Sequence, residues 1–149
     1  LRETNPDLKV VFTVSPVRHL KDGAHGNQLS KAVLLLAVEE LCRKLDDVHY
    51  FEAYELLMDD LRDYRFYAND LSHPNDLAID YIWEKVQSAF LSAETVKTMR
   101  EVYKLVQMQN HRPLHGNSDE YLVHKAKTDK MIRDFEMQNP GVIFNGTEM

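Results

Sequence analysis

Residues 9–14, with the sequence Lys-Val-Val-Phe-Thr-Val, are the stretch that decides the fold of this chain. The run is rich in β-branched and aromatic residues and shows little polar alternation, which is typical of a strand covered on both faces in a parallel sheet. Ser15 and Pro16 end this strand. Residues 48–51, Val-His-Tyr-Phe, predict a second, shorter strand.

The segment between the two strands predicts a helix that begins at about Asn27 or Ser30 and ends at about Leu45. Its apolar residues cover a wide arc, so we expect the helix to be packed on more than one side. Strand, helix and strand joined by tight connections predict a βαβ unit with parallel strands and a right-handed crossover. Because two strands do not make a stable doubly wound sheet, and both are predicted to be covered, we expect further strands from sequence upstream of Leu1.

Helices dominate the rest of the sequence. A short helix is expected over residues 54–61, and Pro74 is placed in the first turn of another helix that runs to about Leu91. Ser92 is a candidate N-cap for the next helix, and a last one is expected over residues 119–137. We therefore predict a helix-rich α/β protein that forms a single partial domain, with an α/β portion at residues 8–91, C-terminal helices at 92–138 and a loosely held tail at 139–149.

With 149 residues, of which 44% are hydrophobic and 28% charged, the chain has the composition of a globular protein that can bury a core. The formal net charge of -6 and the lack of a basic stripe argue against nucleic acid as a partner. No apolar run reaches the roughly 18 residues of a membrane-spanning helix, and we expect a cytoplasmic location. The single cysteine, Cys42, excludes an internal disulfide. His111 and His115 lack a third ligand in the sequence, so we expect no metal and no cofactor.

A polar turn within residues 64–80 carries the candidate chemistry. Asp70 and His73 lie three residues apart, just before the helix that Pro74 opens. This spacing can hold a carboxylate against an imidazole and orient the ring as a general base. The same spacing also suits an ordinary turn, in which the aspartate accepts local backbone hydrogen bonds. The residues by themselves leave both interpretations open.

Four motifs resemble one known family. They are Phe-Thr-Val-Ser-Pro-Val-Arg-His at residues 12–19, Asn-Gln-Leu-Ser-Lys at 27–31, Tyr-Phe-Glu-Ala-Tyr-Glu at 50–55, and Asp-Tyr-Arg-Phe-Tyr-Ala-Asn-Asp-Leu-Ser-His-Pro at 63–74, continued by Trp83 and Glu84. In this order they resemble the GSCFA-domain family, a branch of the SGNH (GDSL-like) hydrolase superfamily found mainly in bacteria. The resemblance covers about residues 10–90.

This resemblance implies an esterase with a three-layer α/β/α, flavodoxin-like fold, of which the chain would be the C-terminal part. Asp70 and His73 would be the acid and base of a Ser-His-Asp triad, and the substrate a small-molecule ester or an acylated carbohydrate. We expect the serine and the oxyanion donors upstream of Leu1, since no Gly-Asp-Ser, Gly-Ser-Cys or Gly-x-Ser-x-Gly occurs in the 149 residues. The isolated chain is accordingly expected to be inactive.

The loop after the first strand supplies candidate substrate contacts. Ser15, Arg18 and His19 follow the carboxyl end of that strand, where open α/β sheets bind their ligands. The Arg18 guanidinium could hold a substrate carboxylate or phosphate with two hydrogen bonds. By contrast, we expect Asn27 and Lys31 to belong to a helix cap and first turn.

An alternative function belongs to another class. The chain could be a non-catalytic helical interaction module, in which an exposed sheet edge promotes a homodimer or adds a strand from a partner. A Gly-Ser-Cys-Phe-Ala-like segment upstream of Leu1 would support the enzyme, and its absence would support the module.

Overall fold

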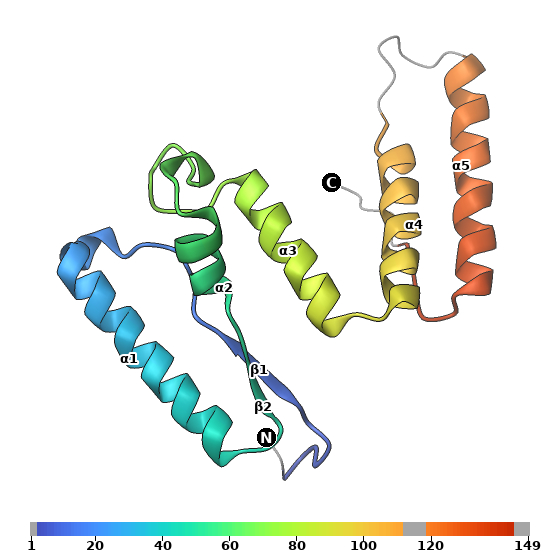
Figure 1. Cartoon of the computed structure of the whole chain (residues 1–149). Coiled ribbons are helices and arrows are strands. Elements are labelled where there is room, and N and C mark those ends of the chain that lie inside the picture. The colour runs from blue at the N-terminus through green and yellow to red at the C-terminus, as the bar shows by residue number, and fades with distance from the viewer. Residues whose placement is uncertain (1–2, 112–118, 145–149) are drawn as a thin grey trace. The chain divides into compact units, whose positions relative to one another are not determined.

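The computed structural model describes residues 3–111 and 119–144, and the chain divides into two compact units (Figure 1). The first unit, Leu1–Phe90, contains, in chain order, β1 (Val10–Thr13), η1 (Leu20–Asp22), α1 (Gly23–Lys44), β2 (Val48–Phe51), α2 (Ala53–Glu55), η2 (Leu56–Leu61), η3 (Tyr64–Phe66) and α3 (Asp76–Phe90). The second unit, Leu91–Met149, contains α4 (Ala93–Gln109) and α5 (Asp119–Gln138).

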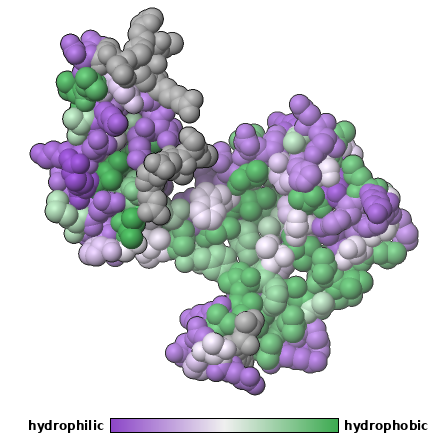
Figure 2. All heavy atoms as spheres, turned by 180° about the vertical axis from the view of Figure 1, so that it is seen from behind, coloured by the Kyte–Doolittle hydropathy of each residue, from purple (hydrophilic) through white to green (hydrophobic). Residues whose placement is uncertain are grey.

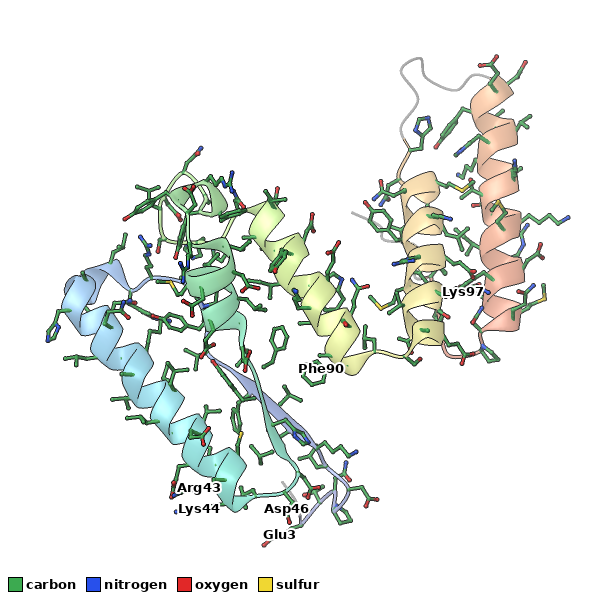
Figure 3. The ribbon with its side chains drawn as sticks, viewed as in Figure 1. Glu3, Arg43, Lys44, Asp46, Phe90 and Lys97 are labelled. Atoms are coloured by element: carbon green, nitrogen blue, oxygen red, sulfur yellow. The ribbon has the colours of Figure 1, made fainter. Side chains whose placement is uncertain are left out.

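The two strands pair in parallel, as predicted. Val10 of β1 lies opposite Val48 of β2, and Thr13 lies opposite Phe51. The connection between the strands is α1, which packs against β2. Phe90 lies at the end of α3, where Figure 3 labels it. Its ring meets that of Phe51 edge-on, with ring centroids 5.7 Å apart. The prediction of a helix-rich α/β chain with two parallel strands is confirmed.

Within the described residues β1 is not covered on both faces, and its cover by further strands stays a prediction. Val11 and Phe12 of β1 keep 45% and 37% of their surface exposed. In α1, Leu29, Val33 and Leu36 are exposed as well, so this helix is not packed on several sides. A two-stranded sheet with one crossover helix has too little partner surface to bury both of its faces. Figure 2 shows hydrophobic side chains gathered on the surface of the first unit.

The helix α1 begins at Gly23, several residues before the predicted start. Glycine is a weak helix former, so Gly23 and Gly26 hid this first turn from sequence analysis. Asn27 lies inside the helix, and its Oδ1 accepts a hydrogen bond from the backbone N–H of His19 at 3.0 Å. A residue expected in the cap or first turn therefore holds the loop that follows β1.

Lys31 of α1 is a second link to that loop. Its side chain is only 2% exposed, and Nζ donates a hydrogen bond to the backbone oxygen of Ser15 at 2.6 Å. Burial lowers the pKa of this ammonium below its ordinary value. The expectation that Lys31 belongs to a helix cap or first turn is wrong, because this side chain points inward and fastens the end of β1 to α1.

A small apolar core lies behind the polar turn. Its buried members are Leu57, Phe66, Tyr67 and Ala78, and Leu61 packs against them. Leu57 belongs to η2, a π-helical segment that directly continues α2, so the helix predicted over residues 54–61 is a composite of these two. The core joins η2, η3 and α3 around the base of the turn.

Asn75 caps α3, which begins at Asp76. Its Oδ1 accepts a hydrogen bond from the backbone N–H of Ala78 at 3.1 Å. The placement of Pro74 in the first turn is wrong: it lies before the cap and forms an isolated antiparallel bridge with Tyr67. The physical reason is that asparagine is a far better N-cap than proline, so Asn75 takes the cap and the helix begins at Asp76.

The second unit is a pair of helices with its own core. The buried apolar residues of α4 and α5 are Leu105, Ile132 and Phe135, on which Val102, Val142 and Phe144 pack. Ser92 caps α4 as predicted, since its Oγ accepts a hydrogen bond from the N–H of Thr95 at 3.1 Å. Because Val142 and Phe144 pack on this core, the described part of the tail is not loosely held. None of the helices within residues 3–111 and 119–144 has the length and apolar character that a bilayer crossing needs.

Candidate functional site

Residues 67–75 form a loop that is closed by its own backbone. Ala68 donates its N–H to the carbonyl oxygen of His73 at 2.8 Å, and Leu71 donates to the carbonyl oxygen of Ala68 at 2.9 Å. Leu71 has a φ of 55°, in the left-handed region that non-glycine residues rarely adopt. The buried ring of Tyr67 anchors the start of the loop in the core. The backbone that carries Asp70 and His73 is therefore well supported.

The carboxylate of Asp70 uses its two oxygens for two different tasks. Oδ1 accepts hydrogen bonds from the backbone N–H groups of Ser72 at 2.9 Å and His73 at 3.0 Å. Oδ2 lies 2.6 Å from Nδ1 of the His73 ring. The local turn and the acid–base pair, which the sequence left as alternatives, are thus present together.

The hydrogen bonds to Asp70 also decide its ionisation. The backbone N–H groups of His73 and Ser72, followed by the His73 ring, lower the pKa of the Asp70 carboxyl to about 2. An ionised carboxylate can only accept, so the Nδ1 of a neutral His73 ring carries the proton and Nε2 keeps a free lone pair. The side chains of His73 and Asp70 are 62% and 51% exposed, which leaves Nε2 accessible. The ring therefore has the tautomer of a general base.

Ser72 joins this loop to the loop that follows β1. Its backbone oxygen accepts a hydrogen bond from the N–H of Arg18 at 3.1 Å, and its Oγ donates to the backbone oxygen of Arg18 at 2.8 Å. Ser72 is buried, and 54 positions separate it from Arg18 in the sequence. The contact brings the two segments with candidate site residues together.

Arg18 lies against two aromatic rings. The carbon at the centre of its guanidinium is 4.2 Å from the ring centroid of Tyr67 and 5.1 Å from that of Tyr64. Burial acts to lower the pKa of Arg18, but hydrogen bonding and charge interactions with Tyr64 and Tyr67 raise it above its ordinary value. The guanidinium is a fixed, positively charged group.

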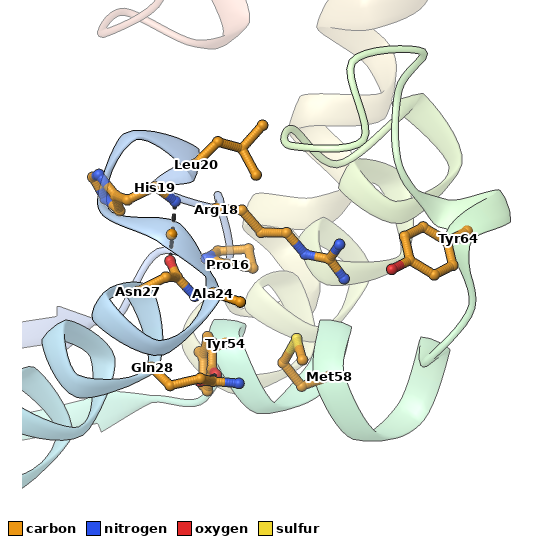
Figure 4. Close-up of a pocket in the computed structure, with 11 residues that line it drawn as sticks. Pro16, Arg18, His19, Leu20, Ala24, Asn27, Gln28, Tyr54, Met58 and Tyr64 are labelled. Carbon is orange, nitrogen blue, oxygen red and sulfur yellow. Dashed lines mark hydrogen bonds between the residues drawn. The ribbon is translucent and has the colours of Figure 1, made fainter.

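A cleft of about 290 Å³ opens beside Arg18 (Figure 4). It is lined by Pro16, Arg18, His19, Leu20, Gly23, Ala24, Asn27, Gln28, Tyr54, Met58 and Tyr64. Of the predicted substrate contacts, Arg18 and His19 line the cleft and Ser15 does not. The Oγ of Ser15 accepts a hydrogen bond from the N–H of Val17 at 3.2 Å. Asp70 and His73 lie outside the lining as well, and the Ser72–Arg18 contact connects them to it.

Sequence analysis missed several residues of this region. Tyr64 and Tyr67, which flank Arg18, carry no signal except their spacing of three residues on a short turn. Ser72 lies inside the Asp-x-x-His motif, where only the two ends attract attention. Gln28 and Tyr54 are joined across the sequence by a 2.9 Å hydrogen bond. These roles depend on partners far away in the chain.

A metal centre finds no support in the described part of the chain, where no group of three or more His, Cys, Asp or Glu side chains could hold an ion. The ring of His111 lies 5.4 Å from that of His124, measured between centroids. His115 lies outside the described residues.

The first unit is a parallel βαβ unit that is followed by an Asp–His pair on a closed polar loop. The sequence model of the GSCFA family matches residues 1–86, which is more than half of the chain. The chain therefore belongs to the GSCFA family. The match includes both strands, the loop after β1 and the Asp70–His73 pair. No curated protein matches the chain. No solved structure matches it either.

Proposed function

We propose that this chain supplies the acid–base pair of a serine hydrolase that cleaves an ester or acyl bond. The observation that carries the proposal is the 2.6 Å contact between Asp70 Oδ2 and His73 Nδ1, combined with the two backbone N–H groups that hold Asp70 Oδ1. A simple turn needs the backbone contacts alone. The additional bond to the ring is what a catalytic dyad requires.

In this proposal, His73 Nε2 takes the proton of a serine hydroxyl as the serine attacks the carbonyl carbon, and returns it to the leaving oxygen. Asp70 holds the ring in position and stabilises the imidazolium. The serine and the oxyanion donors belong to a segment outside these 149 residues, which would complete a three-layer α/β/α fold. Arg18, His19 and Ser15 are the proposed substrate-binding residues. The proposed substrate is a small-molecule ester or an acylated carbohydrate.

The tautomer of His73 tests the dyad in this chain without any need for turnover. Long-range ¹H–¹⁵N correlation spectra should show a protonated Nδ1 and an unprotonated Nε2 at a pH where the ring is neutral. Asp70→Asn keeps an oxygen for the backbone donors but should move the proton to Nε2, because the amide can donate to Nδ1.

The matched control is Asp63→Asn, which alters a carboxylate of the neighbouring turn whose Oδ1 accepts from the N–H of Arg65. This variant should keep the wild-type tautomer of His73. A wild-type ring protonated on Nε2 would contradict the proposed role.

Activity provides the second test. The isolated chain should not hydrolyse p-nitrophenyl acetate above the rate of free imidazole. In a polypeptide that joins the chain to a serine-bearing GSCFA segment, His73→Ala should lower kcat by about 10³-fold or more. Hydrolysis that survives this substitution would show that His73 is not the base.

The exposed apolar side chains of β1 favour a second candidate, a homodimerisation module. Val11 and Phe12 are exposed on a strand whose pairing in the described chain is with β2 alone. Open strand edges readily pair with another copy. Light scattering should then show a dimer that Phe12→Lys dissociates, whereas a monomeric wild-type chain would exclude this candidate.

A further inference from the structure

The cleft beside Arg18 is lined by basic side chains and by no acidic ones. Its lining includes Arg18 and His19 but neither aspartate nor glutamate. The whole protein has 24 acidic against 18 basic side chains, so this lining differs from the average surface of the chain. A cleft with a cation and without a carboxylate favours a negatively charged ligand.

Arg18 is available to such a ligand. Within residues 3–111 and 119–144 it forms no ion pair, although two tyrosine rings hold it in place. The guanidinium has five N–H donors, more than its contacts with Tyr64 and Tyr67 use, so donors remain for two parallel hydrogen bonds to a ligand. Arg65 on the same turn differs, since it lies 4.8 Å from the ring centroid of Phe66 and pairs with Asp63 at 3.8 Å. Of these two arginines, Arg18 alone lacks a carboxylate partner.

The amide side chains of the cleft add hydrogen-bond donors. Asn27 Oδ1 already accepts from the backbone N–H of His19, and Gln28 Oε1 accepts from the Tyr54 hydroxyl at 2.9 Å. These bonds occupy the oxygens and leave the two NH₂ groups for a ligand. Figure 4 shows that Asn27 and Gln28 come from α1, while Arg18 reaches across from the loop after β1. The lining thus offers donors from two segments.

We propose that this cleft is an oxyanion-binding site, which takes a carboxylate or phosphate group through Arg18, Asn27 and Gln28. Both groups present acceptor oxygens in the plane that the guanidinium matches. The volume of about 290 Å³ accommodates the anion and a few neighbouring carbon atoms, for which Leu20 and Met58 provide apolar contact. That the anion is part of the substrate rests on the proposed function, whereas its binding does not.

A titration followed by ¹H–¹⁵N spectra of the full chain tests the site. Inorganic phosphate and acetate are added in separate experiments at constant pH, with sodium chloride holding the ionic strength. We expect saturable shifts of the backbone signals of His19, Gly23 and Ala24 and of the Arg18 side chain. Saturation by phosphate alone, by acetate alone or by both supports the proposal and identifies the class of anion.

Variants separate a specific site from general attraction of anions. Arg18→Gln should weaken binding by about tenfold or more, because a charged hydrogen-bond donor is lost. Gln28→Glu on the exposed face of α1 should also abolish saturation, because it adds a carboxylate to the lining. Arg65→Gln removes the same charge from an arginine already paired with Asp63, and should leave the affinity unchanged.

The proposal is overturned if neither anion gives saturable shifts, or if Arg18→Gln and Arg65→Gln weaken binding equally. These outcomes are independent of the tautomer of His73. Catalysis without anion binding would overturn this site alone, and anion binding with an Nε2-protonated His73 would overturn the dyad alone.

Discussion

Different kinds of contact stabilise the interior of each of the two units. In the first unit, side chains bind the backbone of distant segments, as Lys31 does with Ser15 and Ser72 with Arg18. In the described part of the second, the side-chain hydrogen bonds of Thr128 and Glu136 span at most eight positions: Thr128 donates to the carbonyl oxygen of His124, and Glu136 accepts from the N–H of Phe144 at 2.8 Å. An apolar seam between α4 and α5 suffices for a helix pair. Loops that carry functional side chains need polar links, since they have little apolar surface to bury.

The largest expected effect is on the free energy of unfolding, when a buried core residue of one unit is truncated. Leu57 of η2 is 1% exposed, and Leu57→Ala should lower the free energy of unfolding of the first unit by about 2–5 kcal/mol. The only tryptophan of the chain, Trp83, lies in α3 and reports this transition by fluorescence during urea denaturation. Ile132→Ala in the second unit is the matched control and should leave the Trp83 transition in place. A Trp83 midpoint unaffected by Leu57→Ala would contradict the place of Leu57 in the first core, and one lowered by Ile132→Ala would contradict the division of the cores.

A smaller effect distinguishes a long-range link from a local cap. Ser72→Ala removes the donor to the carbonyl oxygen of Arg18 and should cost about 1–3 kcal/mol. Ser92→Ala removes the N-cap of α4 and should cost about 1 kcal/mol. Amide hydrogen exchange should accelerate in both loops, at residues 15–19 and 67–75, for Ser72→Ala. For Ser92→Ala it should accelerate in the first turn of α4 alone. A purely local response to Ser72→Ala would show that the link does not couple the loops.

The smallest effect concerns the pH dependence of stability. The pKa of Asp70 is about 2 in the folded protein and about 3.9 in an unfolded chain, so the folded state binds this proton more weakly. The stability that Asp70 contributes is therefore fully present above about pH 4 and is lost as the pH falls towards about 2. Between these values Asp70→Asn should lose less stability than the wild type in denaturation measurements. Identical losses would mean that the hydrogen bonds to Asp70 do not persist in solution.

Local features of the structure could be predicted from the sequence. The parallel pair of strands follows from two runs of β-branched and aromatic residues around a helix, and the Ser92 cap follows from a serine before an amphipathic segment. The proximity of Asp70 and His73 follows from their spacing, although the spacing left open whether the ring would bond the carboxylate. Each of these features depends on residues that are neighbours in the chain.

Other features could not be predicted, because their causes are distant in sequence. Asn27 looked like a helix cap, but the helix begins at Gly23 and the amide serves the loop after β1. The exposure of β1 within the described residues could not be predicted, because an apolar run indicates what can be covered and not what surface is present to cover it. Arg18 was identified, but the rings of Tyr64 and Tyr67 beside it were not.

The sequence by itself determined the parallel βαβ unit, the family and the proximity of Asp70 to His73, because periodicity, motif order and spacing act within a few residues. The tertiary structure alone decided that Ser72 fastens the catalytic candidate to the loop after β1, and that Arg18 faces a cleft without a carboxylate. These two facts depend on backbone groups and side chains brought together by folding over more than forty positions. No local pattern in the sequence encodes such contacts, because each donor or acceptor finds its partner only after folding has brought the distant segment close to it.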